Sequence, residues 1–248
     1  MSSVSKHALI FQNRLLSFEQ DIELADIICT AQKAGTLLPD KSLLFGHLDP
    51  SKHQSLNTRK PTARSREIVV KHLRATVFSA YIKDIYEELT LYLKSLIYEA
   101  ALLAKDVSSA KRLLGEHKIT FLASDILQFN TLNELTQKIA EDIIQALENE
   151  RSTKELIKKT CKKISVTIEN QVVEEALPYL ELRHKLVHTD GKVDEAFQEQ
   201  YAMFTYDKDG YVVLTYETIV DAKEKISKLV LALDRVAIAK GILMPNTQ

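Results

Sequence analysis

The sequence predicts a mainly α-helical bundle with one small β-hairpin between its last two helices. Three observations support this fold class. Apolar residues recur at helical spacing over most of the 248 residues. Two segments open with the Ser/Thr-x-x-Glu pattern of a helix N-terminus. Only one stretch, Met203 to Tyr216, has two short β-prone runs, and they flank Asp209-Gly210, a pair typical of a hairpin turn.

The N-terminal third contains two expected helices and a loop. Apolar spacing predicts a helix from about Lys6 to Lys33, which Gly35 closes. Gly and Pro among polar residues predict a long loop over 35–63, with a short helical turn around Lys41 to Phe45. A loop of this length in a compact domain indicates function or disorder. Arg64 to about Lys105 predicts one long helix or two stacked pieces.

The remaining helices are expected from their starts and ends. Thr131 and Ser152 each precede a Glu by three residues, the pattern of a capping box. Asn170 to His188 predicts a further helix, in which Pro178 marks either a kink or the true first turn. A last helix is expected from Thr215 to Lys240, ended by Gly241.

The length suits one large domain or two small ones, and we expect one domain over 1–248, with the loop at 35–63 and a motif-bearing core at about 64–241. Because the net charge is only −1, any nucleic acid would have to bind to local basic patches of the surface. Two distant cysteines, Cys29 and Cys161, are too few for a disulfide framework and suggest a reduced setting. Without a signal-peptide pattern or about 20 uninterrupted apolar residues, we expect a soluble cytoplasmic protein without membrane contact.

Two histidines, His184 and His188, have the i, i+4 spacing of metal ligands on one helix face. A zinc protease places Glu directly after its first His, whereas this chain has Lys185, which would repel a dication. The nearby carboxylates Asp190 and Asp194 offer a third ligand only by proximity in sequence. The metal hypothesis stays open, but we expect no metal and no cofactor.

Arg183 and His188 suit a different chemistry. Arginine is a permanent cation with a planar fork for phosphate, and histidine moves a proton near neutral pH. These two groups suffice to cleave RNA without metal, because RNA supplies its own 2′-hydroxyl nucleophile. Five residues place them roughly 140° apart on a regular helix. They converge if the helix ends near His188, as Thr189-Asp190-Gly191 suggests, or if a second chain contributes its copy. The alternative is an ordinary solvent-exposed end of a helix, where positively charged side chains interact favourably with the helix dipole.

The stretch RHKLVHTDGKVD, 183–194, resembles a known signature. Arg183 to His188 is similar to the R-x4-6-H motif of the HEPN superfamily, in which a polar residue such as His184 follows the arginine. The continuation, with an aromatic at Phe197, resembles the extended motif of several bacterial HEPN families. The resemblance covers about fifteen residues, and the N-terminal 60 residues have no comparable pattern.

The resemblance implies a helical bundle that dimerises with its motif helices facing, and a metal-independent endoribonuclease of toxin–antitoxin or phage-defence systems. His188 would act as general acid or base, Arg183 would stabilise the phosphorane, and His184 would assist. A polar residue from another helix often orients the Arg or His in this superfamily, so Glu87 and Glu88 are candidate supports. Asp190, in the turn after His188, is a further candidate. The products would be a 2′,3′-cyclic phosphate and a 5′-hydroxyl.

Two basic stretches are candidates for binding RNA. Lys154, Lys158 and Lys162 form one i, i+4 row, with Lys159 and Lys163 in the next. Arg64 and Arg66 belong to the densest basic stretch, which runs from Asn57 to Arg74. The alternative for both is an ordinary solvated surface.

The leading hypothesis is therefore a homodimeric HEPN endoribonuclease with RNA as substrate and an antitoxin or other defence protein as a further partner. The alternative is a HEPN-like dimerisation or RNA/nucleotide-binding scaffold that no longer cleaves.

Overall fold

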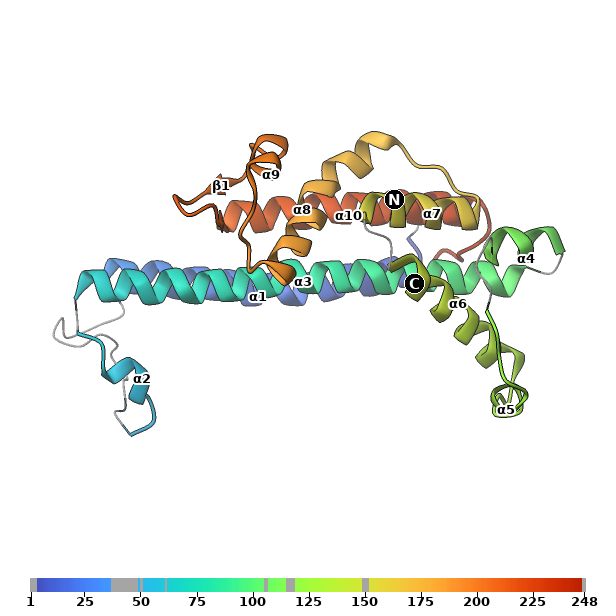
Figure 1. Cartoon of the computed structure of the whole chain (residues 1–248), viewed down its shortest axis with the longest axis horizontal. Coiled ribbons are helices and arrows are strands. Elements are labelled where there is room, and N and C mark those ends of the chain that lie inside the picture. The colour runs from blue at the N-terminus through green and yellow to red at the C-terminus, as the bar shows by residue number, and fades with distance from the viewer. Residues whose placement is uncertain are drawn as a thin grey trace. The chain divides into compact units, whose positions relative to one another are not determined.

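A computed structural model describes residues 4–36, 49, 51–60, 62–104, 107–114, 119–148 and 152–246. The chain is mainly helical with one two-stranded antiparallel hairpin near its C-terminus, which confirms the predicted fold class (Figure 1). The chain divides into two compact units. The first unit comprises 1–14, 84–184 and 222–248, and the second comprises 15–83 and 185–221. Whether these two units form one domain over 1–248, as the sequence predicts, stays a prediction.

The elements follow one another as helices with a single hairpin between α9 and α10. Their bounds are α1 Lys6–Ala34, α2 Gln54–Asn57, α3 Ala63–Leu103, α4 Val107–Leu114, α5 Ala123–Ile126, α6 Leu132–Glu148, α7 Thr153–Ile164, α8 Asn170–His188, α9 Glu195–Gln200, β1 Thr205–Tyr206, β2 Val212–Val213 and α10 Tyr216–Ala239. Helices α1, α3, α8 and α10 contribute residues to both units.

The first unit has a core of helix faces from α3, α6, α8 and α10. Its fully buried side chains include Leu93, Ile97, Ile143, Leu182 and Leu233. A buried carboxylate, Asp234, accepts hydrogen bonds from the Ser5 backbone N–H at 2.8 Å, the Ser5 hydroxyl, and the Tyr92 hydroxyl at 3.1 Å. This network joins the N-terminus, α3 and α10, because a buried carboxylate needs hydrogen-bond donors.

The second unit pairs the later part of α1 with the beginning of α3. The rings of Phe18 and Tyr81 meet edge to face at 6.2 Å, and Arg74 Nη2 lies 2.7 Å from Asp26 Oδ1. The hairpin of this unit aligns Thr205 with Val213 and Tyr206 with Val212. The positive φ of 81° at Gly210 confirms the predicted turn.

Helix ends follow the sequence closely. Gly35 and Gly241 end α1 and α10 with φ of 73° and 69°, the left-handed conformation that glycine favours. Thr131 Oγ1 accepts from the Glu134 N–H, as the capping pattern predicts. Ser152 is also an N-cap, but its side chain makes no capping hydrogen bond. That part of the prediction is wrong.

The structure decides between the alternatives that the sequence left open for the helix after Arg64 and for Pro178. Helix α3 is one continuous helix, and Pro178 lies inside α8 rather than in its first turn. The short helices α2, α4, α5 and α9 were not expected from the sequence. The predicted turn at 41–45 lies outside the described residues, as do 37–48, 50 and 61 of the predicted loop at 35–63.

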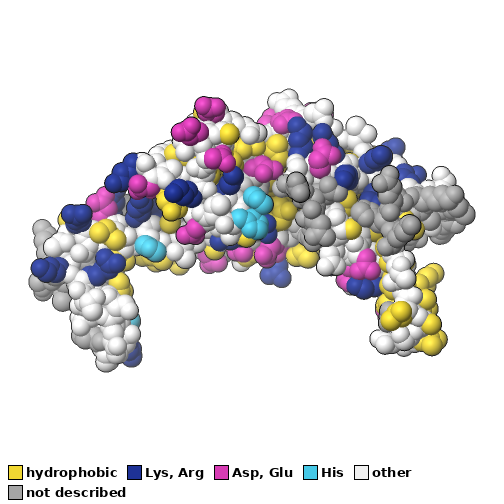
Figure 2. All heavy atoms as spheres, viewed as in Figure 1, with side chains coloured by type: hydrophobic (Ala, Val, Ile, Leu, Met, Phe, Trp, Pro, Cys, Tyr) yellow, Lys and Arg dark blue, Asp and Glu magenta, His cyan; other side chains and the backbone are white. Residues whose placement is uncertain are grey.

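Apolar side chains are exposed over α5 and the start of α6. Figure 2 shows hydrophobic atoms gathered on that surface, and Leu122, Leu127 and Leu132 are 67%, 85% and 76% exposed. Grouped apolar exposure of this kind is typical of protein–protein contact. Among the described residues, no helix combines the length and apolar character needed to cross a membrane.

Candidate active site on helix α8

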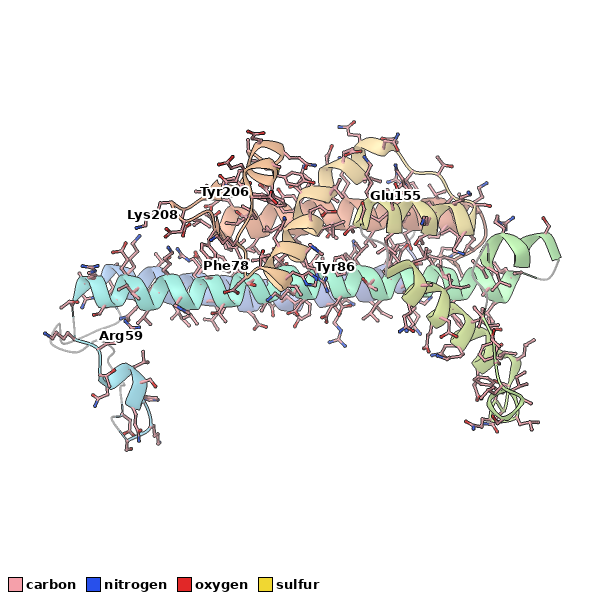
Figure 3. All side chains as sticks on the ribbon, in the orientation of Figure 1. Arg59, Phe78, Tyr86, Glu155, Tyr206 and Lys208 are labelled. Carbon is pink, nitrogen blue, oxygen red and sulfur yellow. The ribbon has the colours of Figure 1, made fainter. Side chains whose placement is uncertain are left out.

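Arg183 is held over an aromatic ring. Its guanidinium carbon lies 4.2 Å from the centre of the Tyr86 ring on α3, which Figure 3 labels. Arg183 is half-buried, and its Nε atom is buried without a hydrogen-bond partner in the described structure. No ion pair joins Arg183 to a carboxylate in the described parts of the chain. Its positive charge is therefore positioned by packing and remains available to an anion.

The segment of α8 that carries Arg183 is anchored within the first unit. Glu174 pairs with Lys154 of α7, and Glu175 pairs with Lys225 and Lys228 of α10 at 3.6 and 2.9 Å. These exposed ion pairs contribute little each. The buried residues Tyr179, Leu180 and Leu182 supply most of the attachment. Arg183 thus projects from a packed part of the helix.

His184 and His188 are exposed on the last two turns of α8, and each has a partner in the structure. The helix ends at His188, as the sequence predicts. All residues from Arg183 to His188 are helical, however, so the backbone changes direction only after His188. The end of the helix therefore does not by itself bring the two side chains together, and the convergence of two copies stays a prediction.

The turn after His188 is built by the next residues of the motif. Asp190 and Gly191 have φ of 55° and 86°, and the Gly191 N–H donates to the Lys185 carbonyl at 3.0 Å. A Cβ on Gly191 would lie 3.2 Å from Leu186 Cδ2. Asp tolerates the left-handed conformation better than most residues, and Gly adopts it freely. Asp190 is exposed in this turn, and its predicted support of catalysis stays a prediction.

Asp194 closes the motif as a helix cap. Its Oδ1 accepts from the Phe197 N–H at 2.8 Å, and its Oδ2 lies 3.4 Å from Lys185 Nζ. The Phe197 hydrogen bond, followed by the charge of Lys185, lowers the pKa of Asp194 below its usual value. Lys185 Nζ also lies 5.4 Å from the centre of the Phe197 ring. Asp194 therefore has a structural role at the start of α9.

The predicted supporting carboxylates flank the residue that contacts Arg183. Glu87 is exposed and Glu88 half-buried, one and two positions after Tyr86. Burial raises the pKa of Glu88 despite the opposing charge of Arg14. Burial and the charge of Glu87 likewise raise the pKa of Asp84. Sequence reasoning selected the carboxylates and missed Tyr86 as the contact, because only packing of α3 against α8 shows which residue of that turn meets Arg183.

The lysines of α7 divide into two groups. Lys158, Lys159 and Lys162 are exposed, as a surface for RNA requires, although Lys158 lies 3.4 Å from Glu155, which Figure 3 labels. Lys163 exposes only 7% of its surface, and its Nζ donates to the carbonyls of Leu113 and Leu114. The prediction that Lys163 belongs to a surface row is wrong, because its side chain turns inward toward α4.

Arg64 and Arg66 lie in the first turn of α3, in the second unit. Thr62 caps this helix by accepting from the Ser65 N–H at 3.2 Å. Arg64 is exposed, whereas Arg66 is half-buried with its Nε unpaired in the described structure. Both arginines can reach solvent, and their predicted contact with RNA stays a prediction.

In the described part of the chain, no three His, Cys, Asp or Glu side chains are grouped as a metal site requires. His184 and His188 thus have no third ligand there. Comparison with known proteins found no matching family model, no matching curated protein and no matching solved structure.

Proposed function

We propose that the protein is a metal-independent endoribonuclease of HEPN type in which Arg183 and His188 carry the chemistry. A base, His188, takes the proton of a ribose 2′-hydroxyl, whose oxygen attacks the adjacent phosphorus. The bond from phosphorus to the 5′-oxygen breaks, and that oxygen takes a proton from a second acid, the protonated His188 of the other chain in a dimer. Arg183 stabilises the negative charge that develops on the phosphorane.

The observation that carries this proposal is the state of Arg183. A half-buried guanidinium that lies 4.2 Å from the Tyr86 ring, without a carboxylate partner among the described residues, is prepared for an external anion. Most arginines near a protein surface are either solvated or paired with carboxylates. A phosphate would supply the missing partner, because its oxygens match the guanidinium fork.

The proposal includes a homodimer, because transfer of two protons is served by two copies of His188. The motif helices of two chains would face each other, with His184 beside the reacting groups. The exposed positions of His184, Val187 and His188 on α8 support such a contact. An antitoxin or other defence protein would control the enzyme.

A second candidate function is a HEPN-like scaffold that binds a partner without cleaving RNA. It is favoured by the carboxylates next to Tyr86: Asp84, Glu87 and Glu88 would repel an RNA backbone close to Arg183. The structural roles of Gly191 and Asp194 also explain part of the motif without catalysis.

The test is cleavage of mixed cellular RNA in EDTA by purified wild-type, Arg183→Ala and His188→Ala proteins. Removing a group that stabilises a transition-state charge lowers the rate by about 100-fold or more. Arg235→Ala, an exposed arginine of α10, and His53→Ala are matched controls and should cleave like wild type. Cyclic-phosphate ends from wild type alone would support the enzyme. Intact RNA with all proteins, while they remain folded dimers, would favour the scaffold.

A further inference from the structure

A cavity of about 210 Å³ lies within the first unit, remote in sequence from the motif of α8. It is open to solvent on one side, and it is lined by the end of α3, by α4, by the end of α7 and by the segment that follows α10. Its lining residues are Ala100, Leu103, Ala104, Ser109, Arg112, Leu113, Lys163, Ile164, Ser165, Lys240 and Ile242.

Among the lining residues that the structure describes, the charged side chains are cationic. Arg112, Lys163 and Lys240 come from three different segments, and none of the described lining residues is a carboxylate. None of these three cations forms an ion pair with a residue that the structure describes. Cations gathered without counter-charges repel one another, so a bound anion would remove an unfavourable electrostatic energy.

Two of the cations are fixed by hydrogen bonds to backbone carbonyls. Lys163 Nζ donates to the carbonyls of Leu113 and Leu114, which leaves one of its three protons for another acceptor. Arg112 Nε donates to the Lys163 carbonyl at 3.3 Å, which leaves its two terminal nitrogens. Carbonyls orient these side chains but do not neutralise their charge. These hydrogen bonds therefore fix two cationic side chains among the residues that line the cavity.

The end of α7 places a hydroxyl in the same lining. Ser165 has a φ of 57°, and its N–H donates to the Lys162 carbonyl at 3.3 Å, which ends the helix. A non-glycine residue in the left-handed conformation costs about 1 kcal/mol. Ser165 is thus a hydroxyl-bearing residue of the same lining. Guanidinium, ammonium and hydroxyl groups together form the donor set typical of phosphate sites.

We propose that this cavity binds the phosphate group of a small phosphorylated ligand. Its volume of about 210 Å³ is below the roughly 300 Å³ at which pockets for whole drug-sized ligands begin, so it has room for a phosphate or diphosphate, and the rest of a larger ligand would extend from its open side. Inorganic phosphate and a phosphate monoester share the chemistry that the cavity recognises. Burial, and then the charge of Lys159, lower the pKa of Lys163, and a bound phosphate would oppose that shift by stabilising the ammonium.

The experiment is isothermal titration calorimetry of the full chain with inorganic phosphate, pyrophosphate and adenosine 5′-monophosphate, with chloride at matched ionic strength. Phosphate should bind, and Lys240→Gln should weaken binding about tenfold, the effect of losing one charge-assisted hydrogen bond. Lys240 is exposed at the end of α10, so its substitution should leave the fold intact. Arg235→Gln, an exposed cation of the same helix outside the lining, should change affinity less than about twofold.

A second variant separates phosphate recognition from charge alone. Arg112→Lys retains the positive charge and removes the planar fork, so it should weaken phosphate binding while its circular dichroism spectrum stays that of wild type. Binding of pyrophosphate or the monoester more tightly than inorganic phosphate would identify the class of ligand. No binding of any probe at millimolar concentration, or equal loss in Arg235→Gln and Lys240→Gln, would overturn the proposal. Neither result bears on RNA cleavage, because Arg183 and His188 do not line the cavity.

Discussion

Helices α7 and α8 end in similar ways but hold their basic side chains by different means. Both are followed by residues with positive φ, Ser165 after α7 and Asp190 with Gly191 after α8. Near the end of α7, Lys163 is buried and donates to two carbonyls of α4. Near the end of α8, Arg183 lies on the ring of Tyr86 and leaves its Nε unpaired in the described structure.

This difference follows from the chemistry of the two cations. An ammonium is a compact, strongly hydrated charge, so its burial requires hydrogen-bond acceptors. A guanidinium is planar and weakly hydrated, so an aromatic face replaces part of its water. The result is one lysine that backbone carbonyls hold in place and one arginine that an aromatic ring holds in place.

The largest expected effect concerns Lys163. Lys163→Met should lower the free energy of unfolding by about 2 kcal/mol, because the carbonyls of Leu113 and Leu114 lose their donor. Urea denaturation would measure the change. Lys162→Met, an exposed neighbour, should stay within about 0.5 kcal/mol of wild type. A Lys163→Met protein more stable than wild type would show that desolvation of the ammonium outweighs its hydrogen bonds.

The turn after α8 provides the next test. Gly191→Ala should lower the free energy of unfolding by about 1–2 kcal/mol, for two reasons. An alanine is strained at the positive φ of this position, and its Cβ would lie only 3.2 Å from Leu186 Cδ2. Gly35→Ala is the matched control, with a φ of 73° and no atom within 4 Å of the added Cβ. Thermal unfolding of both variants would measure the difference. An equal loss of stability in Gly191→Ala and Gly35→Ala would mean that the Leu186 side chain moves aside without cost and that backbone strain causes the whole effect.

The contact between Tyr86 and Arg183 should have a smaller effect. Tyr86→Leu removes the ring and should lower kcat/KM for RNA about fivefold, the effect of an exposed cation–π contact of about 1 kcal/mol. Tyr86→Phe keeps a ring face and should restore most of the activity. NMR provides a readout independent of catalysis, because the Arg183 Nε–H resonance should lose its ring-current shift only in Tyr86→Leu. An unchanged resonance in that variant would exclude stacking in solution.

The smallest expected effect is a pH dependence of stability. Burial lowers the pKa of Lys163 below the ordinary value of 10.5, so between the two values the unfolded chain binds a proton that the folded chain has released. The contribution of Lys163 to stability should therefore rise with pH in that window and be smallest below the folded pKa. Denaturation series for wild type and Lys163→Met would reveal it as a difference in slope. Parallel curves would contradict a lowered pKa.

The candidate site was only partly predictable from the sequence. The motif indicated Arg183, His184 and His188, and the turn residues after His188 indicated the end of α8, which the structure confirms. Tyr86 was missed as the partner of Arg183, because nearly 100 residues separate them and no local pattern links the two positions. The inward turn of Lys163 was missed for the same reason, since a Lys-x3-Lys spacing is the same on a buried and an exposed face.

By itself the sequence determined where most helices begin and end, because caps, glycines and apolar periodicity act within a few residues of chain. Gly35, Thr131 and Gly241 are examples whose local hydrogen bonds and φ values match the pattern. Tertiary structure alone decided which side chains from distant segments meet. It placed Tyr86 against Arg183 and turned Lys163 toward the carbonyls of α4, because side-chain partners from distant segments are chosen by packing and desolvation rather than by local propensity.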